Sequence, residues 1–112
     1  MNITTQDKFE EMEIEKTLGL VRGSTIRTKN IGYDLIASLR TIVGGEIPEY
    51  TKMMDESREE ALKRMYREAQ RRGADAVVGV RFETSSILAG SAEFLCYGTA
   101  VKLKNNIQLN FK

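Results

Sequence analysis

The stretch PEYTKMMDESREEALKRMYREAQRRG, from Pro48 to Gly73, decides the fold because it carries a long, unbroken helical pattern. Its apolar and small residues recur at spacings of three and four, which is typical of a helix with one buried face. Pro48 suits the first helical turn, and Gly73 suits the left-handed position after the last turn. The pattern therefore predicts a helix from Pro48 to Arg72. The buried face would consist of Tyr50, Met53, Met54, Ser57, Ala61, Leu62, Met65 and Ala69.

The opposite face of this helix is charged and is interpreted as facing solvent. Glu59–Lys63 and Glu60–Arg64 place an acid four residues before a base, the orientation that supports a helix. Arg67, Glu68 and the terminal arginines continue the same face, and positive charge at the last turn suits the helix dipole.

The segments on either side of the long helix predict one more helix and several strands. A shorter helix is expected from Ile31 to Val43, ending at Gly44-Gly45. The linker SSILAGS, residues 85–91, is short and turn-like, so the strands before and after it are expected to form an antiparallel hairpin. An alternating C-terminal tail, Asn105–Lys112, predicts an additional strand. The predicted main strands are Glu13–Thr28, Ala76–Thr84 and Ala92–Lys104.

The two strands of this hairpin are apolar on both alternations. AVVGV (76–80) and LCYGTAVKL (95–103) are typical of strands buried on both sheet faces. The expected fold is α+β, with one long helix and a shorter one covering one face of a small antiparallel sheet. A single helix layer cannot cover both faces, so neighbouring subunits are expected to cover the second one.

Three blocks resemble the YbjQ-like family: SLRTIVGGEIPEYTKMM (38–54), GADAVVGVRFET (73–84) and YGTAV (97–101). The resemblance extends in colinear order from about residue 3 to residue 103. It implies a two-layer dodecin-like subunit, assembled as a homopentamer with short extra strands joining the subunits. It also implies a heavy-metal-binding function and brings no catalytic residues.

Length and composition predict one cytoplasmic domain over residues 1–112. A net charge of +1 gives no electrostatic case for nucleic-acid binding. No run reaches the ~18 apolar residues of a membrane span, and the polar, acidic N-terminus does not resemble a signal peptide. One cysteine cannot form an internal disulfide.

Cys96 is the candidate metal ligand, because thiolates bind soft metals. A soft-metal site needs two to four converging sulfur or imidazole ligands, whereas this chain has one cysteine and no histidine. A symmetric ring could bring several copies of Cys96 together. The alternative interpretation is that Cys96 packs in the core as a small apolar residue.

The Gly44-Gly45 loop is a second candidate site, because glycines before a helix can present backbone N–H groups to an anion. Arg40 and Tyr50 flank this loop and would be the side chains nearest such a ligand. The alternative is a structural turn between two helices, with Pro48 starting the second.

Catalytic motifs are not evident: the chain lacks histidine and the GxSxG pattern, so no enzymatic activity is expected. The predicted function is a homo-oligomeric binding protein, with a heavy or soft metal ion as the ligand that the resemblance implies. The alternative is a structural or regulatory oligomer that binds a small molecule or protein at subunit interfaces without metal.

Overall fold

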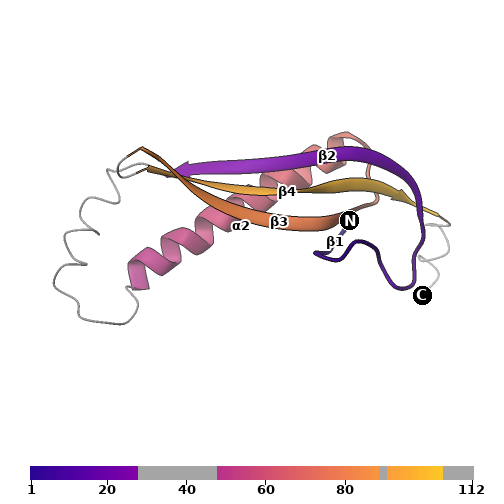
Figure 1. Cartoon of the computed structure of the whole chain (residues 1–112), viewed down its shortest axis with the longest axis horizontal. Coiled ribbons are helices and arrows are strands. Elements are labelled where there is room, and N and C mark those ends of the chain that lie inside the picture. The colour runs from indigo at the N-terminus through magenta and orange to yellow at the C-terminus, as the bar shows by residue number, and fades with distance from the viewer. Residues whose placement is uncertain (28–47, 89–90, 105–112) are drawn as a thin grey trace.

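The structure is a computed structural model that describes residues 1–27, 48–88 and 91–104 (Figure 1). A long helix lies across a sheet of long strands. The elements in chain order are β1 (Asn2–Ile3), β2 (Ile14–Arg27), α2 (Pro48–Arg71), β3 (Ala76–Leu88) and β4 (Ser91–Leu103). The predicted long helix is thus confirmed to within one residue, and so is its C-terminal glycine, which has a φ of 74° at Gly73.

The sheet has four strands in the order β1-β3-β4-β2. β4 pairs antiparallel with both β3 and β2, as predicted for the hairpin. The short β1 pairs parallel with β3 through Asn2 and Ile3, so the sheet is mixed and the prediction of a purely antiparallel sheet was wrong. Two residues are too few to show the alternation by which a strand is recognised in a sequence.

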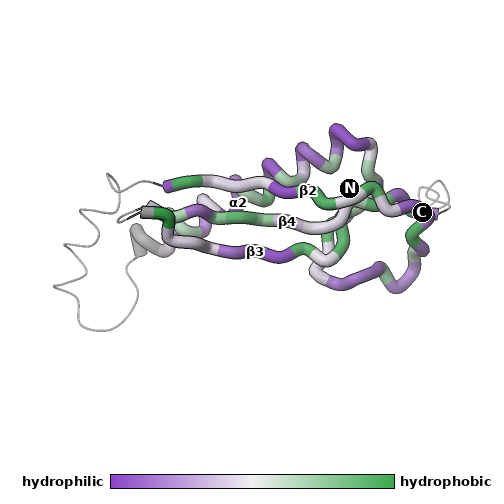
Figure 2. The backbone as a smooth tube through the Cα atoms, turned by 45° about the horizontal axis from the view of Figure 1, so that its top comes forward, coloured by the Kyte–Doolittle hydropathy of each residue, from purple (hydrophilic) through white to green (hydrophobic). Residues whose placement is uncertain are grey.

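The linker between β3 and β4 was predicted to be longer than it is. Residues 85–88 extend β3 and Ser91 begins β4, so SSILAGS belongs mostly to the hairpin strands. Ser85 and Ser86 resembled part of a turn because they are polar and solvent-exposed, although they pair with β4. Figure 2 shows the hydrophilic middle of β3 beside the more apolar β4.

The helix packs on one face of the sheet, over β2 and β4. Its fully buried residues Ala61, Met65 and Ala69 lie against Val21 of β2 and Cys96 of β4. A core cluster of apolar residues joins the two layers: Val21, Ala61, Met65, Ala69, Val77, Val80, Cys96 and Ala100. The predicted two-layer α+β architecture is therefore confirmed.

Two glycines in the strands have different roles from one another. At Gly23 a Cβ atom would lie 2.3 Å from the backbone nitrogen of Met65, so only glycine allows the helix to approach β2 this closely. At Gly79, by contrast, nothing lies within 4 Å of a Cβ built there. It has a φ of 62° at an irregularity between Val78 and Arg81, so its role is to form a β-bulge.

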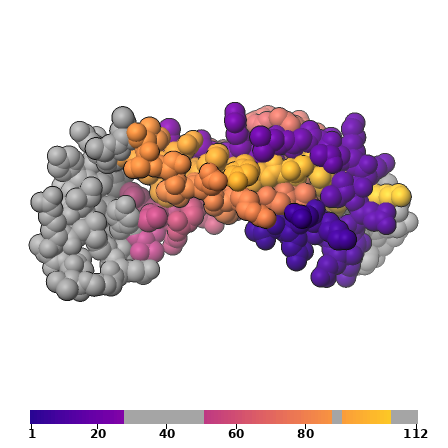
Figure 3. Space-filling model, in the orientation of Figure 1, coloured from indigo at the N-terminus to yellow at the C-terminus, as the bar shows by residue number. Residues whose placement is uncertain are grey.

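The second face of the sheet is covered in part by the chain itself. Phe9, Met12 and Ile14 pack against a buried cluster formed by Ala76, Val78, Val101 and Leu103. Figure 3 shows this N-terminal segment, in indigo, over one end of the strands. This packing inside one chain buries the second face at AVVGV (76–80) and at the end of LCYGTAVKL (95–103), so neighbouring subunits are not needed there. For the rest of the second face, cover by neighbouring subunits stays a prediction.

The rest of the second face and part of β3 remain open in the described residues. Leu20 and Ile26 of β2 are 57% and 56% exposed. On the helix side, Phe82 lies opposite Cys96 in register but is 44% exposed, because the helix does not extend over this part of β3. Two further predictions, the helix at 31–43 and the strand at 105–112, lie outside the described residues.

Candidate functional site

Cys96 lies in the core between β4 and the helix, with no exposed surface. Its Sγ is 3.6 Å from the Sδ atom of Met65, to which the thiol donates a weak hydrogen bond. The side chain faces the inside of its own subunit, so this position does not suit the prediction that copies of Cys96 converge on a symmetry axis. The structure does bring a second soft donor, Met65, to the thiol.

Burial raises the pKa of the Cys96 thiol to about 11, because the thiolate would lose its hydration in the core. The ordinary value is 9.0, so between pH 9 and about 11 the unfolded chain loses this proton before the folded one does. The resulting stabilisation of the fold is present below pH 9 and decreases as the pH rises through that window. A metal would have to displace this tightly held proton.

A hard-metal site is not formed within residues 1–27, 48–88 and 91–104. No group of three or more histidine, cysteine, aspartate or glutamate side chains gathers there in a geometry that could hold an ion. Cys96 and Met65 do bring two sulfur atoms together, with Sγ and Sδ 3.6 Å apart.

The second predicted site falls mainly outside the described residues. Arg40, Gly44 and Gly45 all lie in the segment 28–47. Tyr50 is in the first turn of α2, and its side chain is also outside the description. The predicted anion site at this loop stays a prediction.

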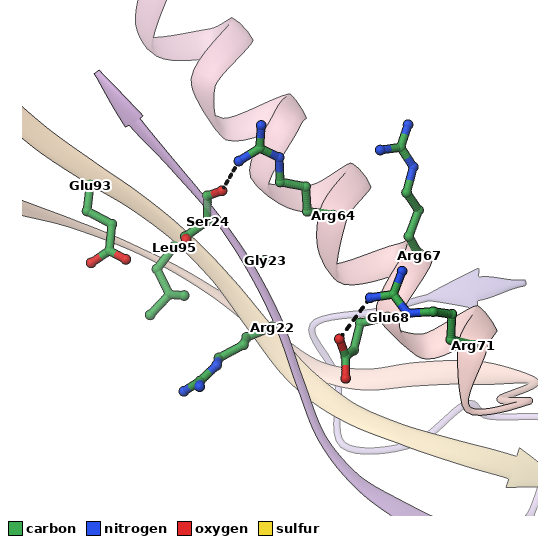
Figure 4. Close-up of a pocket in the computed structure, with 9 residues that line it drawn as sticks. All are labelled: Arg22, Gly23, Ser24, Arg64, Arg67, Glu68, Arg71, Glu93 and Leu95. Atoms are coloured by element: carbon green, nitrogen blue, oxygen red, sulfur yellow. Dashed lines mark hydrogen bonds and ion pairs between the residues drawn. The ribbon is translucent and has the colours of Figure 1, made fainter. Parts of the chain in front are cut away.

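A cleft of about 770 Å³ lies between the outer edge of β2 and the C-terminal half of the helix. Its lining is mostly charged, with four arginines and two glutamates (Figure 4). A neighbouring recess continues it toward Arg72 and Leu20. The residues that line the main cleft are Arg22, Gly23, Ser24, Arg64, Arg67, Glu68, Arg71, Glu93 and Leu95.

Arg64 of the helix and Arg72, directly after its last residue, bind the outer edge of β2. The Arg64 guanidinium donates to the Ser24 carbonyl oxygen at 2.7 Å, and that of Arg72 donates to the Leu18 carbonyl at 3.5 Å. A free strand edge invites pairing with another strand through its unpaired backbone groups. Because side chains already occupy two of these carbonyls, this stretch of β2 is protected against strand addition.

The arginines around the cleft differ in whether they form ion pairs. Glu68 pairs with Arg71 at 3.1 Å and with Arg72 at 3.4 Å. Arg64 pairs with Glu60 at 3.1 Å, and this hydrogen bond lowers the pKa of the Glu60 carboxyl. Arg22 and Arg67 form neither an ion pair nor a side-chain hydrogen bond with any other described residue. Within residues 1–27, 48–88 and 91–104 these two guanidiniums have no partner, which makes them the candidate contacts for a second molecule.

The cleft was not predicted from the sequence, although its helix residues were identified. Arg64, Arg67 and Arg71 recur at spacings of three and four, and this face was interpreted as simply facing solvent. Only the packing shows that Gly23 lets this face lie directly beside the edge of β2. The spacing of three and four between the arginines was the available signal, but it does not reveal a neighbouring strand.

The chain belongs to the YbjQ-like family, whose model is described as "Putative heavy-metal-binding" and matches residues 1–104. The family resemblance found in the sequence is thereby confirmed. A "UPF0145 protein" of Methanococcus vannielii is 83% identical over 93% of this chain and 99% of the relative. A "UPF0145 protein" of Methanosarcina acetivorans is 55% identical over 94% of this chain and 99% of the relative.

A solved structure supports the fold. The crystal structure of a protein of unknown function from Pediococcus pentosaceus, of the DUF74 family, matches with a TM-score of 0.62. The match covers 93% of this chain and 98% of the other at 18% identity, so it supports the architecture alone. Among the described residues, no helix is long and apolar enough to cross a membrane.

Proposed function

We propose that this chain is the subunit of a homo-oligomeric binding protein that acts in the cytoplasm and has no catalytic activity. The observation that supports this most directly is the uncovered apolar surface of the sheet. Leu20 and Ile26 on the second face of the sheet, and Phe82 on its helix face, are each more than two-fifths exposed, although they lie on strands of the folded domain. Exposed apolar surface on a sheet is typical of a protein-binding face.

The outer edge of β3 supports the same proposal. β1 pairs with β3 only at Ala76 and Val77, and the backbone N–H of Val80 donates to the Thr4 carbonyl at 3.1 Å. Beyond Arg81, no described residue pairs with this edge. An open edge of this length favours completion by a neighbouring subunit. The dodecin-like pentamer that the family resemblance implies would supply such neighbours by cyclic symmetry.

Assembly is expected to be measurable by sedimentation equilibrium at micromolar concentrations. The expected result is a single species of about five chain masses. Replacing Phe82 with Glu should shift it toward smaller species while the circular dichroism spectrum stays unchanged, because a charge on this surface opposes burial. Lys52→Glu on the exposed helix face is the matched control. A wild-type monomer throughout the concentration range would contradict the proposal.

A soft monovalent metal ion is the second candidate, as ligand of the Cys96–Met65 pair. The 3.6 Å contact between a thiol and a thioether is the observation that favours it, in accordance with the preference of soft metals for sulfur. Complete burial and a raised pKa oppose it, because the thiol must lose its proton to bind metal.

Titration of the untagged protein with Cu(I) in a competing chelator tests this second candidate. Binding at this pair should be one equivalent per chain, should be lost in Cys96→Ser, and should weaken in Met65→Leu. The affinity should increase about tenfold per pH unit up to the raised thiol pKa, since one proton is released on binding. Stoichiometry and affinity unchanged in Cys96→Ser would contradict it.

A further inference from the structure

An acidic turn projects from the N-terminal segment at one end of the sheet. Phe9 and Met12 form an isolated antiparallel bridge, and Glu10 and Glu11 between them form the exposed turn. Phe9 and Met12 pack into the cluster on the second sheet face, so the turn is anchored in place. We name Glu10 and Glu11 the acidic turn.

The cleft described above, lined by four arginines, is named the arginine cleft. The segment around the acidic turn is mainly negative, and the arginine cleft is mainly positive. Residues 7–15 carry five carboxylates and one lysine, whereas the whole chain has a net charge of only +1. Four arginines against two glutamates line the cleft. A nearly neutral protein with two such separated regions has surfaces that are complementary to each other.

The acidic turn and the cleft lie toward opposite margins of the sheet. β2 forms one margin, and β1 next to β3 forms the other. The segment before the turn is fixed at the β3 margin, where Gly79 N–H donates to the Gln6 carbonyl at 2.8 Å and Arg81 donates to the Thr5 carbonyl at 2.8 Å. Figure 3 shows this segment projecting beyond the strands at the lower right. One copy cannot therefore readily place its own turn in its own cleft.

We propose that the arginine cleft receives the acidic turn of a second copy, with Glu10 and Glu11 pairing with Arg22 and Arg67. This inference rests on the proposed homo-oligomer and names one of its contacts. The acidic turn of one copy and the arginine cleft of the next are different surfaces at opposite margins of the sheet, so they would form a head-to-tail contact. Repetition of such a contact closes a ring when the rotation between subunits permits it.

The arrangement of the arginines favours such a protein segment over a small anion. Figure 4 shows Arg67 extending away from the helix and Arg22 pointing away from it below β2, so that their guanidiniums do not converge on one point. A single phosphate would need convergent donors. Strand addition is disfavoured as well, because Arg64 and Arg72 already occupy carbonyls of this edge. A turn that presents two separate carboxylates suits this geometry.

Charge reversal of each partner tests the contact in the full-length protein. Glu10→Lys with Glu11→Lys, and separately Arg22→Glu with Arg67→Glu, are each expected to raise the dissociation constant of the assembly roughly tenfold to a hundredfold. The chain with all four substitutions should recover assembly, because the opposite charges then meet again. Wild-type assembly should also weaken as the salt concentration rises.

Matched controls separate this contact from general effects of charge and folding. Lys52→Glu with Lys63→Glu, and Glu56→Lys with Glu59→Lys, change the net charge equally on exposed helix residues outside the cleft. These controls should leave assembly unchanged. If a reversed variant fails to fold by circular dichroism, the neutral pair Glu10→Gln with Glu11→Gln replaces it and should weaken assembly several-fold.

A cross-link tests proximity independently of stability. Glu11→Cys with Arg67→Cys should form a disulfide between chains under mild oxidation, whereas Glu11→Cys with Lys52→Cys should not. A monomeric wild-type protein would overturn the proposed function. An assembled wild type whose dissociation constant is unaffected by either reversal, or affected by only one of them, would overturn this contact and leave the proposed function intact.

Discussion

Gly23→Ala is expected to lower the free energy of unfolding by about 3 kcal/mol, because no space exists for even one methyl group. A Cβ atom at this position would lie 2.3 Å from the Met65 nitrogen, 2.4 Å from the Ala61 carbonyl oxygen and 2.7 Å from the Arg64 Cβ. Two of these three atoms belong to the helix backbone. The helix would therefore have to move away from β2, which would loosen both the core and the arginine cleft.

Urea unfolding, followed by circular dichroism at a fixed protein concentration, measures this effect. The concentration must be held constant because assembly adds to the apparent stability. Gly73→Ala is the matched control: its φ is 74°, but nothing lies within 4 Å of the added Cβ. Its cost should be only about 1 kcal/mol, from the left-handed backbone alone. Equal losses for the two variants would contradict the steric explanation.

Met65→Ala is expected to lower the free energy of unfolding by about 2–5 kcal/mol, because it leaves a cavity in a closed core. Met65 has no exposed surface and lies between the helix and β4, in contact with the Cys96 sulfur. The same urea titration measures the loss. In this variant the Cys96 thiol should also react with a thiol reagent faster than it does in the native protein.

Two further substitutions identify the cause of this loss. Met65→Leu nearly conserves volume and should cost less than about 1.5 kcal/mol, although it removes the sulfur contact. Gln70→Ala on the exposed face of the same helix should change stability by less than about 0.5 kcal/mol. If Met65→Leu were as destabilising as Met65→Ala, the sulfur contact rather than packing volume would stabilise the core.

The secondary structure followed from the sequence where a pattern was long enough to repeat. The helix from Pro48 contains several turns with one apolar stripe, and its C-terminal Gly73 was identified with it. β4 was predicted within one residue at each end. β1 was missed because two residues show no period, and the end of β3 was missed because polar strand residues resemble a turn.

The candidate sites were harder to predict, because each depends on residues far apart in the chain. Periodicity placed Met65 on the buried stripe, but only the packing brings it within 3.6 Å of Cys96, thirty-one residues away. Arg67 was assigned to a solvent-facing side of the helix, and it is indeed exposed. That this side borders the edge of β2, close to Arg22, could not be inferred from either segment alone.

By itself, the sequence determined the family, the long helix, the hairpin strands and the apolar character of both strand faces. Local physical chemistry decides these features, since backbone preference and side-chain alternation act over a few residues. The tertiary structure alone decided what covers each face. It showed that Phe9 and Met12 bury one end of the second face, that Cys96 faces the core, and that Gly23 admits the helix to β2. These contacts join segments that are far apart in the chain, and no local pattern in the sequence indicates which distant segments will meet. They therefore follow only from the packing of the whole domain.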